Sequence, residues 1–320
     1  MARIAALPAF VLTLVAAAAA GCGGDGRSSL PTVDLALDFT PNAVHAPIYA
    51  AVRRGFDRAN GIDLRIRQPG GGPDALKLVA SGRVALGVLD IGDLAIARRR
   101  GVDIVAVGEL VNRPLAALIA QPHIRRPRDL EGKTIGVSGL PSDPAFVKAI
   151  MAHDGGDARK VRQLTIGFAA VSMLLTRRVA AVPAFWNAEG VALRRRGRDV
   201  REFRIDDFGA PPYPEVVLMT ARSTLRRHRD RVLAALRAIA AGIEEVRARP
   251  AAAVRQIAAA AQTDDVTLIR AQLDAVAPLF EPGLRLNRRI IERWADFQVR
   301  IGLIDRRPQV DRAFDFSLAR

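Results

Sequence analysis

A short run at a predicted strand-to-helix junction, Phe185-Trp186-Asn187-Ala188-Glu189, combines an aromatic surface with directional hydrogen-bonding groups. Trp186 offers a face for stacking, while the Asn187 amide and the Glu189 carboxylate can read the edge of a polar ring. Open α/β sheets place their ligands at the carboxyl ends of their strands. A helix cap beside a core aromatic would leave the same pattern. The functional interpretation makes Trp186, Asn187 and Glu189 candidate ligand-binding residues.

A second group of this kind ends the first predicted strand, in the run from Leu37 to Asn42. Phe39 supplies an aromatic face, Asn42 both a donor and an acceptor, and His45 a ring nitrogen one turn into the next helix. Asn42 could instead cap that helix, and Phe39 could be a core residue. Because the group again follows a parallel strand, we expect Phe39, Asn42 and His45 to contact a ligand.

Three further residues complete the candidate ligand site. Asp90 and Ser138 stand where two other predicted strands end, and Tyr213 lies in the loop Pro211-Pro212-Tyr213-Pro214. Tyr213 could close a cleft over a ligand, or it could pack beneath its own loop.

The sequence contains no arrangement of residues that is typical of a catalytic site or a metal site. The four histidines are far apart and the single cysteine is Cys22, so neither a zinc site nor a disulfide can be built. Gly136-Val137-Ser138-Gly139 lacks the glycine spacing of a nucleophile elbow. Adjacent carboxylates such as Asp206-Asp207 fall at turns. We therefore expect no enzyme, no cofactor and no metal.

Hydrophobic periodicity predicts two strand–helix series and a helical tail. In the first series, strands at 32–39, 62–67, 84–89 and 103–111 alternate with helices at 43–58, 75–81 and 93–100. After a strand at 115–120, the second series has strands at 133–138, 161–166, 180–185, 201–205 and 216–221, with helices at 142–153, 168–178 and 187–196. The tail has helices at 223–248, 250–261, 264–280 and 287–302. This alternation is typical of parallel sheets covered by helices.

The order of these series predicts an α/β protein of two lobes joined by a two-crossing hinge. We assign residues 32–121 and 222–320 to lobe one and 122–221 to lobe two, with chain crossings near 121–124 and 219–222. The apolar faces of the tail helices need a partner that is already built, and the first sheet is the natural one. A cleft between two such lobes is a common place for a small molecule.

The N-terminus is typical of an export signal. Arg3 precedes an apolar run at 5–20, and Gly21-Cys22 is followed by a small, polar run. The apolar run contains Pro8 and is shorter than the ~20 residues of a membrane-spanning helix. Ala19-Ala20-Gly21-Cys22 resembles a bacterial lipobox, although the first position usually carries Leu. We therefore expect a signal peptide at 1–21, lipidation of Cys22 and a flexible tether at 22–31; ordinary cleavage that leaves a free thiol is the alternative.

The net charge of +15 invites comparison with nucleic-acid-binding proteins. Only four of the basic residues are lysine, and the arginines are spread in pairs and triplets over the polar faces of predicted helices. Such spacing favours solvated helix faces over a nucleic-acid footprint. A basic surface could still hold the protein near anionic lipid headgroups.

Taken together, Leu37–Asn42, His45, Tyr49, Gly70–Gly72, Ser81-Gly82 and Phe185–Gly190 resemble the ThiY-like branch of the SsuA/ThiY periplasmic binding proteins. The resemblance covers residues 33–222 well. It implies a type II periplasmic-binding-protein fold, an extracytoplasmic location, and delivery of a ligand to an ABC permease and its ATPase. It also implies a formylated or hydroxymethyl aminopyrimidine of the thiamine pathway as ligand. Phe39, Trp186 and Tyr213 would stack on such a ring, while Glu189, Asn187 and Asn42 would bind its nitrogens.

The sequence also departs from the family. Phe39 stands where tryptophan is usual, which leaves riboflavin, a sulfonate or nitrate open as the ligand. The related eukaryotic pyrimidine synthase has a cofactor lysine where this chain has Leu89 and a catalytic histidine where it has Asp93. Its cysteine-rich motif is absent as well. The enzyme is therefore the less favoured alternative. A third possibility, a sensor domain of a membrane receptor, would need a partner helix or domain, which we do not expect in this chain.

Overall fold

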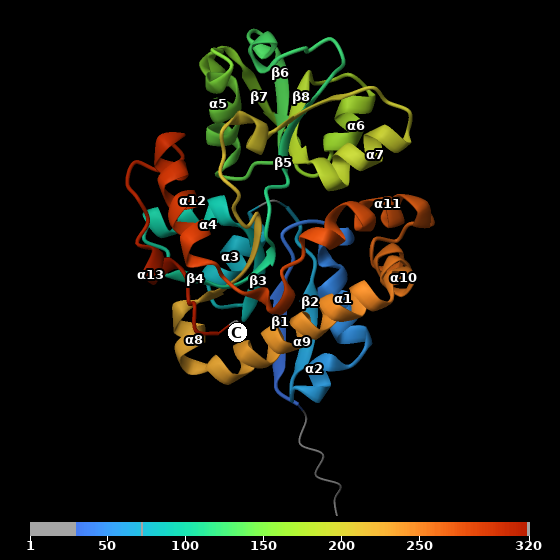
Figure 1. Ribbon diagram of the computed structural model, residues 1–320, viewed down its shortest axis with the longest axis vertical. Coiled ribbons are helices and arrows are strands. Elements are labelled where there is room, and N and C mark those ends of the chain that lie inside the picture. The colour runs from blue at the N-terminus through green and yellow to red at the C-terminus, as the bar shows by residue number, and fades with distance from the viewer. Residues whose placement is uncertain (1–29, 72, 319–320) are drawn as a thin grey trace, which may run out of the picture.

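The computed structural model describes residues 30–71 and 73–318, which form two α/β lobes, one above the other (Figure 1). The expected signal peptide, Cys22 and nearly all of the expected tether lie outside the described residues. Among the residues described, no helix is both long and apolar enough to cross a membrane.

The sheet of lobe one has five strands in the order β2-β1-β3-β10-β4. β1 runs parallel to β2 and β3, whereas β10 runs antiparallel to β3 and β4. The strands are β1 (Thr32–Ala36), β2 (Asp63–Arg67), β3 (Leu86–Asp90), β4 (Ile104–Val111) and β10 (Val216–Ala221). Its helices are η1 (Ala43–His45), α1 (Ala46–Arg53), α2 (Phe56–Ala59), α3 (Asp74–Ala80) and α4 (Ile91–Arg99).

The sheet of lobe two has five strands in the order β7-β6-β8-β5-β9. β6 runs parallel to β7 and β8, and β5 runs antiparallel to β8 and β9. The strands are β5 (Ala116–Ala120), β6 (Thr134–Val137), β7 (Arg162–Thr165), β8 (Ala181–Phe185) and β9 (Arg201–Arg204). Its helices are η2 (Pro127–Leu130), α5 (Asp143–His153), η3 (Ala158–Lys160), α6 (Ala170–Leu175), η4 (Trp186–Gly190), α7 (Val191–Arg195) and η5 (Ile205–Phe208).

These pairings correct the predicted boundaries between the lobes. The strand at 116–120 belongs to lobe two, because β5 pairs with β8 and β9. The strand at 216–221 belongs to lobe one, because β10 pairs with β3 and β4. The chain therefore crosses between the sheets at 112–115 and 209–215, earlier than the predicted 121–124 and 219–222.

The C-terminal tail contacts both lobes rather than lobe one alone. Its helices are α8 (Arg222–Arg227), α9 (Arg229–Ala248), α10 (Pro250–Ala260), α11 (Val266–Val276), η6 (Ala277–Leu279), η7 (Pro282–Leu284), α12 (Arg288–Arg300) and α13 (Val310–Ala313). α11 and α12 lie on opposite sides of the molecule near the level where the lobes meet (Figure 1). From α11, the buried Gln272 donates to the carbonyl oxygen of Ala188 in η4, at 3.1 Å.

Two predicted helices are interrupted for local reasons. The predicted helix at 43–58 is divided by Gly55, whose left-handed backbone (φ 71°) separates α1 from α2. The predicted helix at 223–248 is divided at His228, which ends α8 and precedes α9.

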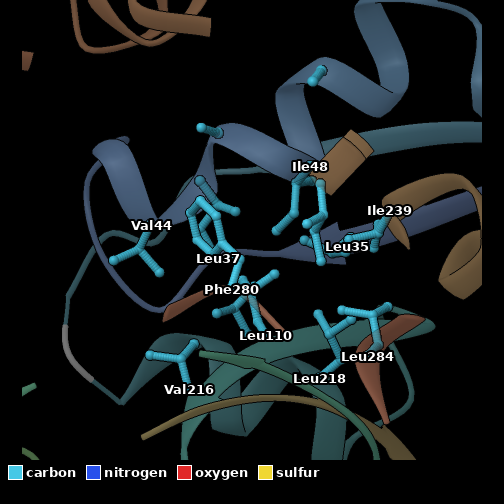
Figure 2. Packing of buried hydrophobic residues seen from close by; sticks show 14 of the residues in the cluster. Leu35, Leu37, Val44, Ile48, Leu110, Val216, Leu218, Ile239, Phe280 and Leu284 are labelled. Carbon is cyan, nitrogen blue, oxygen red and sulfur yellow. The ribbon is translucent and has the colours of Figure 1, made fainter. Parts of the chain in front are cut away.

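The core of lobe one lies between its sheet and helices α1 and α9. Leu35 of β1, Ile48 of α1, Ile239 of α9 and Phe280 are fully buried against one another (Figure 2). The close approach of α1 and α9 depends on Gly242, where a Cβ would come within 2.0 Å of the Pro47 carbonyl oxygen. This packing holds the first half of the chain to the tail and fixes the frame of the site.

Candidate functional site

One cavity lies where the carboxyl ends of the strands of the two sheets face each other, and we call it the interlobe cavity. Its wall includes the residues that follow β1 and β3 in lobe one and β6, β7 and β8 in lobe two. The crossing segment before β10 and helix α12 complete it. Its position agrees with the general placement of ligands at strand ends in α/β proteins.

Six of the nine predicted ligand-binding residues line the interlobe cavity, and three do not. Those in the wall are Phe39, Asn42, Asp90, Ser138, Glu189 and Tyr213. His45, Trp186 and Asn187 lie outside it.

Aromatic rings from the two lobes meet in the cavity wall. Phe39 follows β1, and Phe168 follows β7; their ring centroids are 4.2 Å apart with the planes inclined by 56°. Phe168 is not among the residues predicted from the sequence, although it follows a strand end just as Phe39 does. The two rings form one apolar wall that spans the gap between the lobes, so any opening of the lobes must separate them.

Glu189 reaches the cavity from an unusual local structure. Residues Trp186–Gly190 form one turn of π-helix, a form that occurs mostly as single turns and frequently at functional sites. The Glu189 Oε2 accepts a hydrogen bond from the Phe185 N–H at 3.0 Å, which fixes the orientation of the carboxylate. Burial raises the pKa of this carboxyl above its ordinary value.

The same turn directs Trp186 and Asn187 away from the cavity. The Trp186 Nε1 donates to the Pro114 carbonyl oxygen at 3.2 Å, and the guanidinium of Arg204 lies 4.3 Å from the centre of its ring. Asn187 is fully buried, and its amide has no hydrogen-bond partner among the described residues. Trp186 therefore packs next to the crossing at 112–115, and neither residue is positioned to touch a ligand in this arrangement.

His45 is fully buried behind the cavity wall, where it positions Asp38. Its Nε2 lies 2.7 Å from Asp38 Oδ1, and its Nδ1 accepts the Asn42 N–H at 3.2 Å. The Asn42 side chain in turn accepts the Val44 N–H, so Asn42 caps the helix while it also lines the cavity. The structure thus confirms the capping role of Asn42, while its contact with a ligand stays a prediction.

Ser138 and Tyr213 lie beside buried carboxyl groups. The Ser138 Oγ donates to Asp143, which also accepts the N–H groups of Gly139 and Leu140. Tyr213 stacks on Phe297 of α12, with ring centroids 6.4 Å apart. Its neighbour Glu215 accepts the Leu115 N–H at 2.7 Å and so ties the two crossing segments together.

The wall of the cavity is acidic. It contains six carboxyl groups and, among the described residues that line it, no lysine, arginine or histidine; the acids are Asp38, Asp90, Asp93, Asp143, Glu189 and Glu215. Burial raises the pKa values of Asp93 and Glu215 to about 7. It also raises the pKa of Asp90 well above its usual range, with Glu215 and Asp93 adding like-charge repulsion. This electrostatic character favours a ligand that donates hydrogen bonds or carries positive charge.

The described residues bring together neither a group of metal ligands nor a lysine in the cavity wall that could hold a pyridoxal cofactor. No group of three or more Asp, Glu, His or Cys side chains there has the geometry to hold a metal ion. Leu89, which the resemblance to the pyrimidine synthase places at its cofactor lysine, is 2% exposed and lines the cavity.

The family model that matches this chain is described as NMT1/THI5 like and covers residues 42–253. The chain belongs to the NMT1/THI5-like family. The matched region contains every predicted ligand-binding residue except Phe39.

Two curated relatives show the range of this family. The chain is 31% identical over 219 residues to a formylaminopyrimidine-binding protein of Halalkalibacterium halodurans, an alignment that spans 68% of this chain and 66% of that protein. It is 33% identical over 97 residues to a 4-amino-5-hydroxymethyl-2-methylpyrimidine phosphate synthase of Schizosaccharomyces pombe, covering 30% of this chain and 28% of the synthase.

Among solved structures, the alkanesulfonate-binding protein SsuA from Xanthomonas axonopodis pv. citri aligns with a TM-score of 0.72 at 16% identity. The alignment covers 90% of this chain and 99% of that one. The fold is therefore that of the periplasmic binding proteins, as the sequence predicted.

Proposed function

We propose that this protein is the solute-binding component of an ABC importer and that it captures a single-ring aminopyrimidine of the thiamine pathway. The observation that carries the proposal is the interlobe cavity, which is bounded by aromatic rings, rich in carboxyl groups and without a cation among its described lining residues. A flat ring with amino groups matches both properties, because its face packs on aromatic rings and its edge donates to carboxylates.

Cavity size supports a one-ring ligand. The interlobe cavity has a volume of about 150 Å³. An apolar cavity of about 150 Å³ engineered in another protein takes up benzene. Riboflavin, with three fused rings and a ribityl chain, exceeds this space, whereas a substituted pyrimidine fits it.

Charge argues against the anionic alternatives. A sulfonate or nitrate would have to leave water for a cavity whose described lining residues include no cation to pair with it, so the cost of burying the anion would not be offset. The SsuA relative is similar in fold, but fold alone does not fix the ligand. We therefore consider sulfonate and nitrate less favoured as ligands than the aminopyrimidine.

The synthase alternative is disfavoured by the chemistry of the same wall. A pyridoxal cofactor is held as a Schiff base by a lysine amine. Leu89 cannot form that bond, and the described residues that line the cavity include no lysine. We propose a binding protein and not an enzyme.

The N-terminal sequence supports export and anchoring. Cleavage before Cys22 and lipidation of its thiol would hold the protein on the outer face of the cytoplasmic membrane, where it would deliver its ligand to a permease and the permease's ATPase. The flexible tether at 22–31 would let the two lobes reach that partner.

Isothermal titration calorimetry with 4-amino-5-hydroxymethyl-2-methylpyrimidine tests the proposal. We expect Glu189→Gln to weaken binding about tenfold to a hundredfold, because a hydrogen bond to a charged group contributes about 1.5–3 kcal/mol. The matched control is Glu244→Gln, at an exposed position on α9, which should leave the affinity unchanged. Tight binding of taurine or nitrate that is indifferent to Glu189→Gln would refute the pyrimidine assignment.

A further inference from the structure

One end of the interlobe cavity contains polar groups that the proposed pyrimidine contacts do not use. It lies between the start of α4, helix α5 and helix α12, and it contains Asp93 and Trp294. Asp93 is 1% exposed, and neither of its carboxyl oxygens has a partner in good hydrogen-bond geometry among the described residues, although the side chain and backbone of Ser142 lie close enough to lower its pKa. Trp294 is fully buried, and its Nε1 is likewise without a partner there.

Unsatisfied buried groups of this kind are uncommon in folded proteins. Most buried polar atoms have at least one partner, and each exception calls for an explanation such as an unoccupied ligand site. Removing a carboxylate from water without a partner is costly, whereas an ammonium group placed beside it offsets that cost. The buried oxygens of Asp93 are thus incompletely satisfied, which favours a further donor supplied by the ligand.

Two more carboxyl groups extend this end of the cavity toward the crossing segments. Asp90 precedes Asp93 by one helical turn at the start of α4, and its Oδ1 is buried without a partner among the described residues. Glu215 lies in the second crossing, and its Oε2 accepts the Leu115 and Ala116 N–H groups. The two backbone donors compensate Glu215 in part, whereas the buried Asp90 oxygen has no such compensation.

The charged groups around this end of the cavity are mostly of one sign. Asp143 of α5 and Asp38 after β1 repel the Asp90 carboxylate, as Glu215 and Asp93 do. Asp206 adds to the repulsion at Glu215, and the Tyr213 phenol donates to it. Hydrogen bonds from the side chain and backbone of Ser142, and the positive charge of Arg100, an exposed residue just after α4, act on Asp93 in the opposite direction by lowering its pKa.

We propose that Asp90 and Asp93 form a cation subsite that binds an ammonium group on the ligand, so that the protein prefers an aminomethyl pyrimidine to its neutral hydroxymethyl counterpart. This inference rests on the proposed function, because it adds a second contact to the same bound ring. Glu189 would bind the ring amine at one end of the cavity, and the two aspartates would bind the substituent at the other.

Proton release is a consequence of the subsite. Burial holds the pKa of Asp93 and of Glu215 at about 7, so near neutral pH these carboxyls are partly protonated while the subsite is empty. A bound ammonium group favours the ionised form and lowers those pKa values, which expels protons. A neutral ligand excludes water without supplying charge and leaves the protons in place. Preference for the amine should therefore increase as the pH rises from 6 to 8.

Calorimetry with two matched ligands tests the subsite. They are 4-amino-5-aminomethyl-2-methylpyrimidine and 4-amino-5-hydroxymethyl-2-methylpyrimidine, which differ only in a CH₂NH₃⁺ or a CH₂OH group. At pH 7 we expect the amine to bind about tenfold to a hundredfold more tightly, the range for a charge-assisted hydrogen bond. Titrations in buffers of different ionisation enthalpy should show proton release with the amine only.

Amino-acid variants and the pH dependence of binding test whether Asp93 causes the preference for the aminomethyl pyrimidine. Asp93→Asn should reduce the ratio of the two affinities to near one, while the exposed control Asp207→Asn should leave the ratio as in the wild type. Should Asp93→Asn fail to fold, the pH dependence of the ratio in the wild type still decides the question. Equal affinity for the two ligands at pH 6 and pH 8, without proton release, would overturn the cation subsite and leave the proposed function standing. If neither pyrimidine binds, the proposed function fails and the subsite fails with it.

Discussion

Glu109 provides a test of the structure that does not depend on any ligand. It lies on β4, is 2% exposed, and its Oε2 has no hydrogen-bond partner among the described residues. Burial, with a smaller repulsion from Glu281, raises the pKa of Glu109 from 4.5 to about 8. Glu281 and the arginines Arg113, Arg285 and Arg288 line the same cavity as Glu109. The ionised form of Glu109 is therefore disfavoured in the folded protein.

The sign of the effect on stability follows from proton binding. Between the unfolded pKa and the folded pKa, the folded protein holds a proton on Glu109 that the unfolded chain has lost, so stability falls as the pH rises. The difference of about 3.5 pH units corresponds to at most about 5 kcal/mol, at about 1.4 kcal/mol per unit. Glu109→Gln keeps the shape of the side chain and removes the ionisation. We expect its free energy of unfolding to exceed that of the wild type by several kcal/mol at pH 9 and to be similar at pH 5.

Urea unfolding of the wild type, Glu109→Gln and Glu244→Gln at pH 5, 7 and 9 measures this difference. Glu244 is an exposed glutamate on α9, so the control should follow the wild-type curve at every pH. Asp93 and Glu215, whose pKa values are also raised, contribute equally to all three proteins and cancel in the comparison. A wild type and a Glu109→Gln variant with the same loss of stability between pH 5 and pH 9 would refute the reasoning.

Three further predictions concern packing, motion and anchoring. Gly242→Ala should destabilise the protein by about 1–3 kcal/mol in thermal or urea unfolding, because its Cβ would meet the backbone of α1, whereas Gly71→Ala, with no atom within 4 Å of the added Cβ, should not. Small-angle X-ray scattering should show a smaller radius of gyration with 4-amino-5-hydroxymethyl-2-methylpyrimidine, since a ligand held by both lobes favours the closed form; an unchanged profile at saturation would argue against closure. Cys22→Ser should release the protein from membranes, and a variant that still sediments with them, together with no lipid mass on the wild type, would disprove the lipid anchor.

Local sequence patterns predicted most strands and helices, but not which sheet two of the strands join. β5 and β10 are almost wholly buried and, apart from Thr220, apolar, so neither has an alternating pattern that points to one lobe. Their membership is decided by long-range antiparallel pairing with β8 and β9 and with β3 and β4. No feature within either strand reports such a partner, which is why the predicted crossings were misplaced.

Strand ends could be located from the sequence, and the residues chosen there line the interlobe cavity, whereas the direction of the side chains could not be predicted. Phe39, Asp90 and Ser138 line the cavity because each stands at or just after the end of a strand. Within Trp186–Gly190, a turn of π-helix directs Glu189 to the cavity and directs Trp186 and Asn187 away from it. No local pattern in the sequence indicates that turn. Trp294 belongs to a strongly amphipathic helix, so its position was indistinguishable from ordinary core.

Competition for the wild-type protein tests the central claim most directly. Purified protein is mixed with equal concentrations of the hydroxymethyl and aminomethyl pyrimidines, riboflavin, taurine and nitrate, and the bound species is identified by native mass spectrometry. The proposed function predicts one pyrimidine per protein chain, with the other three ligands excluded by the size and the charge of the interlobe cavity. A complex with riboflavin, taurine or nitrate, or no complex at all, would contradict it.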